Sequence, residues 1–469
     1  MSVFRKKSIP AMILESQQKS GLKKALGALD LTALGIGAII GTGIFVLTGI
    51  AAAKYAGPAL VLSFVVSGLA CAFAALVYAE FASMVPVSGS AYTYSYAALG
   101  EFFAWIIGWD LMLEYALASS TVAIGWSGYF VSLLNGLGIH LPQWATLSAA
   151  SGGLVNIPAI VIALLITWLI SIGIKESARV NNIIVGVKLF AVLVFIVVAA
   201  FYVKPSNWHP FLPFGFSGVF HGAAIVFFAY IGFDAVSTAA EEVKNPQRDL
   251  PRGIIASLII CTVLYIVVAA LLTGIVPYTQ LNVAAPVSLA LQLIHQNWAA
   301  GIISIGAIGG ITTVLLVMIY GQTRIFYAMS RDGLLPKIFS EIHPKHKTPW
   351  KSTWLTGIVV AVLAGVTPID VVAEMVNIGT LAAFVFVSIA VIVLRKTQPD
   401  LQRAFRCPAV PIVPGLAAIF CLFLMTQLPL ITWVRFVVWL LVGLFIYFLY
   451  GRTHSEMADP NFDPGKIAK

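Results

Sequence analysis

The chain has 469 residues, of which 60% are hydrophobic and only 10% are charged, and its net charge is +9. Soluble globular domains carry about 25% charged residues, so this composition excludes a soluble protein. The apolar residues fall in long blocks, and a block of about 20 such residues spans a bilayer as a helix. Lipid admits only helices or closed barrels, and these blocks are not ten-residue alternating strands. The composition therefore predicts an all-α polytopic membrane protein.

The apolar blocks predict twelve transmembrane helices. Their expected ranges are 31–54, 57–84, 101–134, 155–174, 180–202, 217–241, 252–276, 299–331, 352–368, 373–395, 410–428 and 432–451. A short interfacial helix is expected within 277–298. The resulting division has an N-terminal tail, five helices, five further helices, two C-terminal helices and a C-terminal tail. These parts cover residues 1–30, 31–202, 217–395, 410–451 and 452–469, respectively.

The basic residues are unevenly distributed over the predicted loops. Twelve spans put both termini on one side, and most of the 28 Lys and Arg residues fall on that side. The N-terminal tail contributes Arg5, Lys6, Lys7, Lys19, Lys23 and Lys24. The positive-inside rule assigns this face to the cytoplasm. Both termini are therefore predicted to be cytoplasmic, and the basic excess is expected to face anionic lipid rather than nucleic acid.

Four glycines interrupt the first span, which contains LGIGAIIGTGIF at 34–45. Each glycine in a helix interior costs about 1 kcal/mol relative to alanine. Close packing between membrane helices explains small residues four apart, such as Gly37 and Gly41. It does not explain Gly41, Thr42 and Gly43 together near the middle of a span. This triplet predicts an unwound backbone whose N–H groups, at the positive end of a half-helix, bind a carboxylate.

The sixth span contains Gly232 at its middle, beside the intramembrane Asp234. A break here would free carbonyl groups that attract an ammonium group. The carbonyls expected to do so belong to Phe228, Ala229 and Ile231. Spans one and six are five apart, so the second unit of five has inverted topology, which is typical of transporters with a central site between two discontinuous helices. The two breaks together suit a zwitterion, and an α-amino acid is the simplest one.

Four stretches of the chain resemble the amino acid–polyamine–organocation transporters, and among them bacterial members related to the cationic amino acid transporters. The stretches are GAIIGTGIF, YAEFASMVPVSGSAYTYSY, FFAYIGFDAVSTAAEEVKNPQRDLPRGI and TRIFYAMSRDGLLP. The resemblance implies a five-plus-five inverted-repeat fold with two extra C-terminal helices, and amino acid uptake across the cell membrane. Its carboxylate-binding positions correspond to Ile40, Gly41, Thr42 and Gly43, and its amino-group-binding positions to Phe228, Ala229 and Ile231.

Lys188 is an ionisable residue inside the fifth span, nine positions beyond Arg179. That spacing places it about 13 Å along the helix. Snorkelling to the interface is the alternative explanation, but no polar residue lies near it in the span. The family resemblance implies that a lysine here reaches the helix 1 break, where sodium sits in sodium-coupled relatives. Because buried lysines readily lose their proton, Lys188 is expected to carry a coupled proton, with a sodium site at Thr312 and Thr313 as the alternative.

Two carboxyl residues and a methionine are candidates for the substrate pocket or its surroundings. Asp110 and Glu114 share one face of the third span. Glu114 is expected either to attract a cationic substrate or to tie packed helices, and the tie is favoured for Asp110. Met318 in the eighth span either fills space or limits the size of a substrate side chain. Glu80, at the inner end of the second span, is expected to form a gate or loop contact.

The predicted activity is import of L-amino acids, small neutral and secondarily cationic ones, by proton symport with alternating access. An amino acid exchanger or a sodium-coupled carrier of the same fold is the alternative. A channel would need a continuous polar pore, and an enzyme would need clustered His, Asp or Cys residues; the sequence favours neither. The expected partners are the amino acid, protons and membrane lipid. No cofactor or metal is expected, and the sequence leaves any accessory subunit open.

Overall fold

The computed structural model describes residues 5–7, 9, 12, 25–85, 90–173 and 178–458. Lys19, Lys23 and Lys24 of the predicted basic tail lie outside these residues. So do residues 86–89 within the second family-like stretch, residues 174–177, and residues 459–469 of the predicted C-terminal tail.

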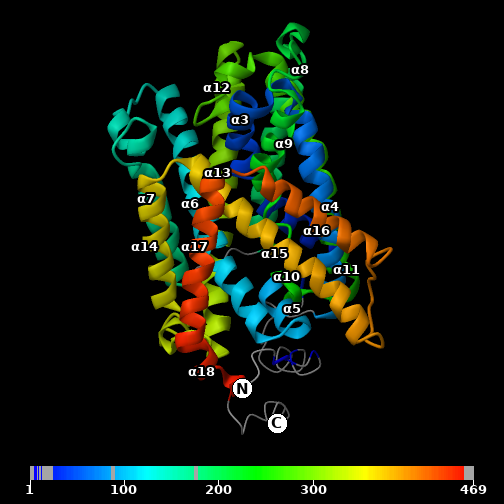
Figure 1. The fold of residues 1–469 in the computed structure, drawn as a ribbon. Helices are drawn as coiled ribbons and strands as arrows, with labels where there is room; N and C mark the ends of the chain where they lie inside the picture. The colour runs from blue at the N-terminus through cyan, green and yellow to red at the C-terminus, as the bar shows by residue number, and fades with distance from the viewer. Residues whose placement is uncertain are drawn as a thin grey trace.

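Within the described residues, the regular structure is helical, apart from two isolated β-bridges. Seven of these helices are long and apolar enough to cross a membrane, and five more apolar helices are shorter. Figure 1 shows them as one bundle, with α3 and α12 toward one end and α5 and α18 toward the other. The predicted all-α polytopic membrane architecture is confirmed at this level.

Helical structure coincides with each of the twelve expected spans. Helix 1 is α2 (Ala28–Ile39) followed by a π-helical turn (Gly43–Leu47), α3 (Thr48–Ala51) and a second π-helical turn (Ala52–Ala56). Helices 2 to 5 are α4 (Leu60–Met84), α6 (Glu101–Gly136), α7 (Ile157–Ser171) and α8 (Ala178–Ala200). Helix 6 is α9 (Gly215–Val226), a 3-10 turn (Phe227–Tyr230) and, after a break, α10 (Ala235–Thr238). The remaining expected spans correspond to the helices α11 (Pro246–Ile275), α13 (Asn297–Arg331), α14 (Trp350–Val366), α15 (Ile369–Thr397), α16 (Ile412–Thr426) and α17 (Leu430–Ile446).

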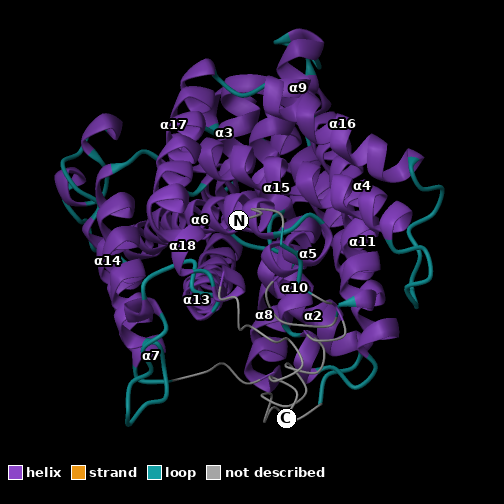
Figure 2. Cartoon of the chain, turned by 60° about the horizontal axis from the view of Figure 1, so that its bottom comes forward, coloured by secondary structure: helices purple, strands orange, loops and turns teal. Residues whose placement is uncertain are grey.

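Three short helices lie outside these spans. The helix α12 (Pro286–Leu293) falls in the stretch where an interfacial helix was expected. The helix α18 (Arg452–His454) follows α17 through a π-helical turn. The helix α5 (Ser90–Ala98) was not predicted and packs beside α10, as Figure 2 shows from the end at which both helices lie.

Helices that lie five positions apart in the order of the expected spans pack against each other. The helix α4 contacts α11, α6 contacts α13, and α7 contacts α14. The turns beside the two interruptions, 43–47 and 227–230, are also in contact. Each pair is separated by five positions in the order of the helices.

Both interruptions lie at the glycine-containing segments. The helix α2 ends at Ile39, and Ile40 has extended backbone angles. In helix 6 the chain leaves the 3-10 turn at Ile231, which is also extended. Gly232 follows with φ +112°, a conformation that side-chain-bearing residues rarely adopt. Steric freedom at glycine therefore permits the helix 6 break.

The two breaks pack against each other, backbone to backbone. A Cβ atom on Gly43 would lie 2.3 Å from Cα of Ala229, and one on Gly232 would lie 2.8 Å from the carbonyl oxygen of Ala38. Neither contact leaves room for a methyl group. The glycines thus bring the interrupted segments of helices 1 and 6 together in the middle of the bundle.

Candidate functional site

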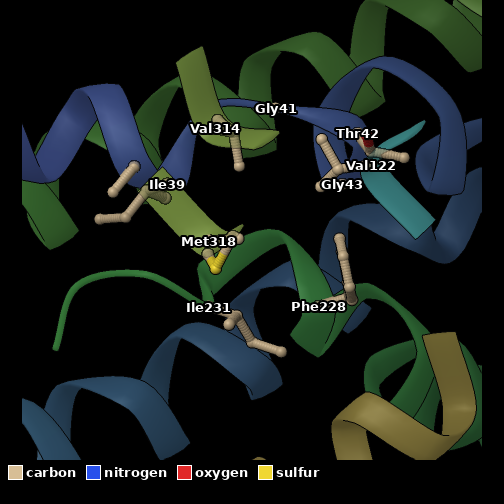
Figure 3. A pocket seen from close by; sticks show the side chains of 10 residues that line it. Ile39, Gly41, Thr42, Gly43, Val122, Phe228, Ile231, Val314 and Met318 are labelled. Carbon is tan, nitrogen blue, oxygen red and sulfur yellow. The ribbon is translucent and has the colours of Figure 1, made fainter. Parts of the chain in front are cut away.

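A small cavity lies between the two breaks (Figure 3). Its lining residues are Ala38, Ile39, Gly41, Thr42, Gly43, Val122, Phe228, Ile231, Val314 and Met318. They come from helices 1, 3, 6 and 8. Six of these lining residues were predicted from the sequence as substrate-site residues: Gly41, Thr42, Gly43, Phe228, Ile231 and Met318. The other two predicted backbone positions, Ile40 and Ala229, are fully buried and adjoin lining residues in the sequence.

The cavity is very small. Its volume of ≈ 10 Å³ is about what one water molecule requires. Figure 3 shows the Met318 sulfur beside Ile231 on one wall of the cavity, with Phe228 on another. An amino acid therefore fits only after the walls move apart.

The second half of helix 1, which follows the break, presents its N-terminal end to the cavity. Its first backbone hydrogen bond runs from the N–H of Phe45 to the carbonyl oxygen of Gly41, at 3.2 Å. The N–H groups that precede this bond have no partner inside the helix, because a helix start leaves its first donors free. Partial positive charge at a helix N-terminus favours an anion here.

Thr42 adds a side-chain hydroxyl to the same wall. Its Oγ1 is buried and has no hydrogen-bond partner among the described residues. The side chain is accommodated by Gly125 of α6, where a Cβ atom would lie 2.5 Å from Cγ2 of Thr42. A buried hydroxyl without a hydrogen-bond partner destabilises the protein. A ligand that hydrogen-bonds to it removes this penalty and therefore binds more tightly.

Lys188 of α8 reaches the C-terminal end of α2, the first half of helix 1. Its Nζ lies 2.8 Å from the carbonyl oxygen of Gly37, 3.0 Å from that of Ile40, 3.3 Å from that of Gly310 and 3.5 Å from Oγ1 of Thr313. The side chain is fully buried, so it does not snorkel to the interface. The ammonium group donates to carbonyls at the negative end of α2, which is the position that favours a cation.

The hydroxyl groups of the two threonines proposed for the alternative sodium site have different hydrogen-bond partners. Thr313 lies near Nζ of Lys188, as described above. Thr312 instead accepts a hydrogen bond from Nε1 of Trp126 at 3.0 Å and donates to the carbonyl oxygen of Ile308 at 2.7 Å. The Lys188 ammonium therefore lies where these residues would have to hold sodium.

Asp110 and Glu114 lie in the core, outside the set of residues that line the cavity. Both are almost completely buried, and each has one carboxyl oxygen without a hydrogen-bond partner in the described part of the chain. Asp110 packs closely on α15, where a Cβ atom on Gly379 would lie 2.8 Å from its Oδ1. This contact agrees with the expected role of Asp110 between packed helices.

Tyr265 of α11 was missed by the sequence analysis, although it contacts both breaks. Its hydroxyl lies 3.0 Å from the carbonyl oxygen of Ile39 and 2.9 Å from that of Ala229. A lone tyrosine in the apolar stretch CTVLYIVV reads as packing, and nothing in its spacing indicates partners in helices 1 and 6. The one available signal is that a buried tyrosine needs a partner for its hydroxyl.

Glu80 forms the loop contact that was expected at the inner end of helix 2. Its carboxylate accepts from Nε and Nη2 of Arg395 at 2.8 and 2.7 Å, and from the N–H of Cys407 at 2.7 Å. Nε of Arg403 lies 3.2 Å away. Burial, together with the Glu80 carboxylate, raises the pKa of the Cys407 thiol to about 12. The cluster fastens α4 to α15 and its following loop, away from the cavity lining.

A cavity between two interrupted helices, within a bundle of membrane-length helices, is typical of a secondary transporter. The chain matches the family model of amino acid permeases over residues 26–453, and it belongs to that family. It is therefore a multi-pass membrane transporter and not an enzyme, and the resemblance read from its four sequence stretches is confirmed.

Three similar proteins span nearly all of the chain or most of it. The chain is 63% identical to the branched-chain amino acid permease BcaP of Bacillus subtilis, over 97% of this chain and 99% of the relative. It is 57% identical to the methylthioribose transporter of the same organism, with the same coverage. It is 41% identical to the vacuolar cationic amino acid transporter 4 of Arabidopsis thaliana, over 85% of this chain and 68% of the relative. The family and two of these relatives, BcaP and the cationic amino acid transporter, support amino acid transport.

Proposed function

We propose that the protein imports branched-chain L-amino acids across the cell membrane by proton symport with alternating access. The observation that carries the proposal is the cavity between the helix 1 and helix 6 breaks, which combines backbone ends of opposite polarity with apolar walls. Opposite ends select a zwitterion, and the walls select its side chain.

The backbone of the substrate is held by two helix ends. Its carboxylate faces the N–H groups of Gly41, Thr42 and Gly43, with the Thr42 hydroxyl as an additional donor. The predicted position Ile40 adjoins this group, but its own N–H already donates to the carbonyl oxygen of Ile36 at 2.9 Å. Its ammonium group faces the carbonyls of Phe228, Ala229 and Ile231. Charge-assisted hydrogen bonds of this kind are roughly twice as strong as neutral ones, so they offset the removal of both charges from water.

The side-chain pocket favours apolar substrates. Val122, Val314, Met318 and Ile39 supply aliphatic or thioether surface, and the lining contains no charged residue. Glu114 lies outside this lining, which moves the proposal away from cationic substrates. The similarity to BcaP supports branched side chains among the neutral ones.

A second candidate substrate is methylthioribose, because a relative with 57% identity is named for its transport. That molecule carries neither a carboxylate nor an ammonium group. It would leave both helix ends without their charged partners, so the geometry ranks it below an amino acid.

Proton coupling is assigned to Lys188. The protonated side chain bonds to the Gly37 and Ile40 carbonyls and holds the first half of helix 1. A neutral amine has two N–H donors instead of three and no charge, so loss of the proton loosens this contact. Exchange without net proton movement, or coupling to sodium, is the alternative within the same fold.

The proposed architecture has twelve spans in a five-plus-five inverted repeat, followed by two helices, with both termini in the cytoplasm. The packing of α4 with α11, α6 with α13 and α7 with α14 supports the repeat, since each pair joins corresponding helices of the two halves. Glu114 and Met318 keep their proposed influence on substrate selectivity, Met318 directly and Glu114 from behind the lining.

A ligand screen on the purified protein tests the substrate assignment. A ligand bound to the native state raises the melting temperature. Leucine, isoleucine and valine are expected to raise it, arginine to raise it less, and 4-methylpentanoate and leucinol, which lack one charged group each, to have little effect. Stabilisation by methylthioribose without stabilisation by any amino acid would contradict the proposal.

A further inference from the structure

The phenol of Tyr265 joins the two interrupted helices. Ile39 is the last residue of α2, and Ala229 belongs to the last turn of helix 6 before its break. The Tyr265 hydroxyl lies within hydrogen-bond distance of both carbonyl oxygens, at 3.0 and 2.9 Å. One side chain of α11 therefore contacts a carbonyl end of each broken helix.

These two contacts compete for a single hydrogen. A phenol has one O–H donor, and a carbonyl oxygen only accepts. Hydrogen bonds weaken steeply as the donor angle departs from linearity, so the hydroxyl can bond well to one carbonyl at a time. The other carbonyl is then left with a weaker contact.

Packing fixes the position of the hydroxyl. The Tyr265 ring packs at 5.5 Å between centroids against both Phe64 and Tyr230, and the residue is fully buried. Tyr230 uses its own hydroxyl elsewhere, donating to the carbonyl oxygen of Phe64 at 2.8 Å. Since the ring cannot swing away, the direction of the Tyr265 O–H depends on what else binds the two carbonyls.

On the helix 1 side, Tyr265 and Lys188 together cap the end of α2. Lys188 donates to the carbonyls of Gly37 and Ile40, and Tyr265 donates to the carbonyl of Ile39, which lies between these two residues in the sequence. The last carbonyls of a helix have no partner within it, so these two side chains determine how firmly the first half of helix 1 is held.

We propose that Tyr265 transmits the binding of the substrate ammonium group on helix 6 to the first half of helix 1. This inference rests on the proposed function, in which the Ala229 carbonyl accepts from that ammonium group. The arriving ammonium replaces the phenol at Ala229, and the Tyr265 hydrogen is then donated fully to Ile39. Substrate binding thereby strengthens the hydrogen bond that caps α2, although the amino group of the substrate does not itself contact α2.

Hydrogen–deuterium exchange of the amides in 28–40 tests this step in the purified full-length protein. Saturating leucine is expected to slow their exchange about two- to tenfold in the wild type, the range for one buried hydrogen bond. In Tyr265→Phe, which keeps the packed ring, leucine is expected to raise the melting temperature but not to slow this exchange. Tyr230→Phe is the matched control, because it removes a neighbouring hydroxyl that contacts neither break, and it is expected to retain the slowing.

A second arm uses the wild type alone, so it does not depend on how the variant folds. 4-Methylpentanoate, which is leucine without its amino group, is raised to a concentration that stabilises the protein as much as leucine does, or to its solubility limit. It is expected not to slow exchange in 28–40. Undiminished slowing in Tyr265→Phe, or equal slowing by 4-methylpentanoate, would overturn the inference. If leucine failed to shift the melting temperature of the wild type, the proposed function would fall, and the inference with it.

Discussion

The hydroxyl of Thr42 is the side-chain donor that the account assigns to the proposed substrate carboxylate. It lines the cavity and has no hydrogen-bond partner among the described residues. Hydrogen bonds to charged groups contribute about 1.5–3 kcal/mol. At the residue scale, the site therefore combines backbone donors, which mutation cannot remove, with one donor that it can.

Thr42→Val is expected to raise KM for leucine about tenfold or more, because an isosteric methyl group replaces the donor. Radiolabelled uptake in cells, corrected for expression, measures the change. Thr121→Val is the matched control, since its buried hydroxyl bonds to the Leu117 carbonyl of its own helix. An unchanged KM in Thr42→Val would exclude the hydroxyl from substrate binding.

Met318→Ser is expected to admit longer substrates, because the side chain that lines one wall of the cavity becomes shorter. Competition of unlabelled arginine and phenylalanine against leucine uptake measures this change. Met318→Leu keeps a similar volume and should preserve the wild-type selectivity. If arginine and phenylalanine inhibit leucine uptake equally in both variants and in the wild type, Met318 does not limit the size of the pocket.

At the element scale, the two breaks were predictable because their signals are local. Glycines and a hydroxyl residue inside an apolar span indicate an unwound backbone, and the structure has interruptions at these segments. The deep position of Lys188 was also readable from its spacing. The partners of Tyr265 were not, because both are backbone carbonyls in distant helices. The helix α5 was missed because it crosses no apolar block.

Gly43→Ala is expected to abolish transport, because its Cβ would lie 2.3 Å from the backbone of Ala229 and force helices 1 and 6 apart. Leucine uptake and the melting temperature measure the loss of function and of packing. Gly186→Ala is the control, since a Cβ there meets no atom within 4 Å. Normal uptake by Gly43→Ala would mean that the two breaks need not touch.

At the scale of the whole molecule, the proposed arrangement in the membrane rests on the even number of expected spans and on the charge asymmetry of the loops. The four native cysteines are all buried, so an introduced cysteine on an exposed loop can be labelled against a low background. His140 and Lys345 are exposed and belong to loops on opposite predicted faces.

His140→Cys is expected to react with a membrane-impermeant maleimide in intact cells, and Lys345→Cys only after lysis. The difference follows from the cytoplasmic position of the basic loops. Gel-shift labelling reads both variants in parallel. The reverse pattern would invert the proposed topology, and labelling of both in intact cells would contradict the twelve-span layout.

In the proposed transport cycle, the helix breaks bind an amino acid while Lys188 couples its movement to a proton. The most direct measurement is leucine uptake into proteoliposomes under an inward proton gradient, without sodium and without internal substrate. Wild-type protein is predicted to accumulate leucine above the external concentration and to lose this accumulation when an ionophore dissipates the gradient. Lys188→Met should not accumulate it, whereas Lys204→Met, at an exposed loop position, should behave as the wild type. Full gradient-driven accumulation by Lys188→Met would contradict the account.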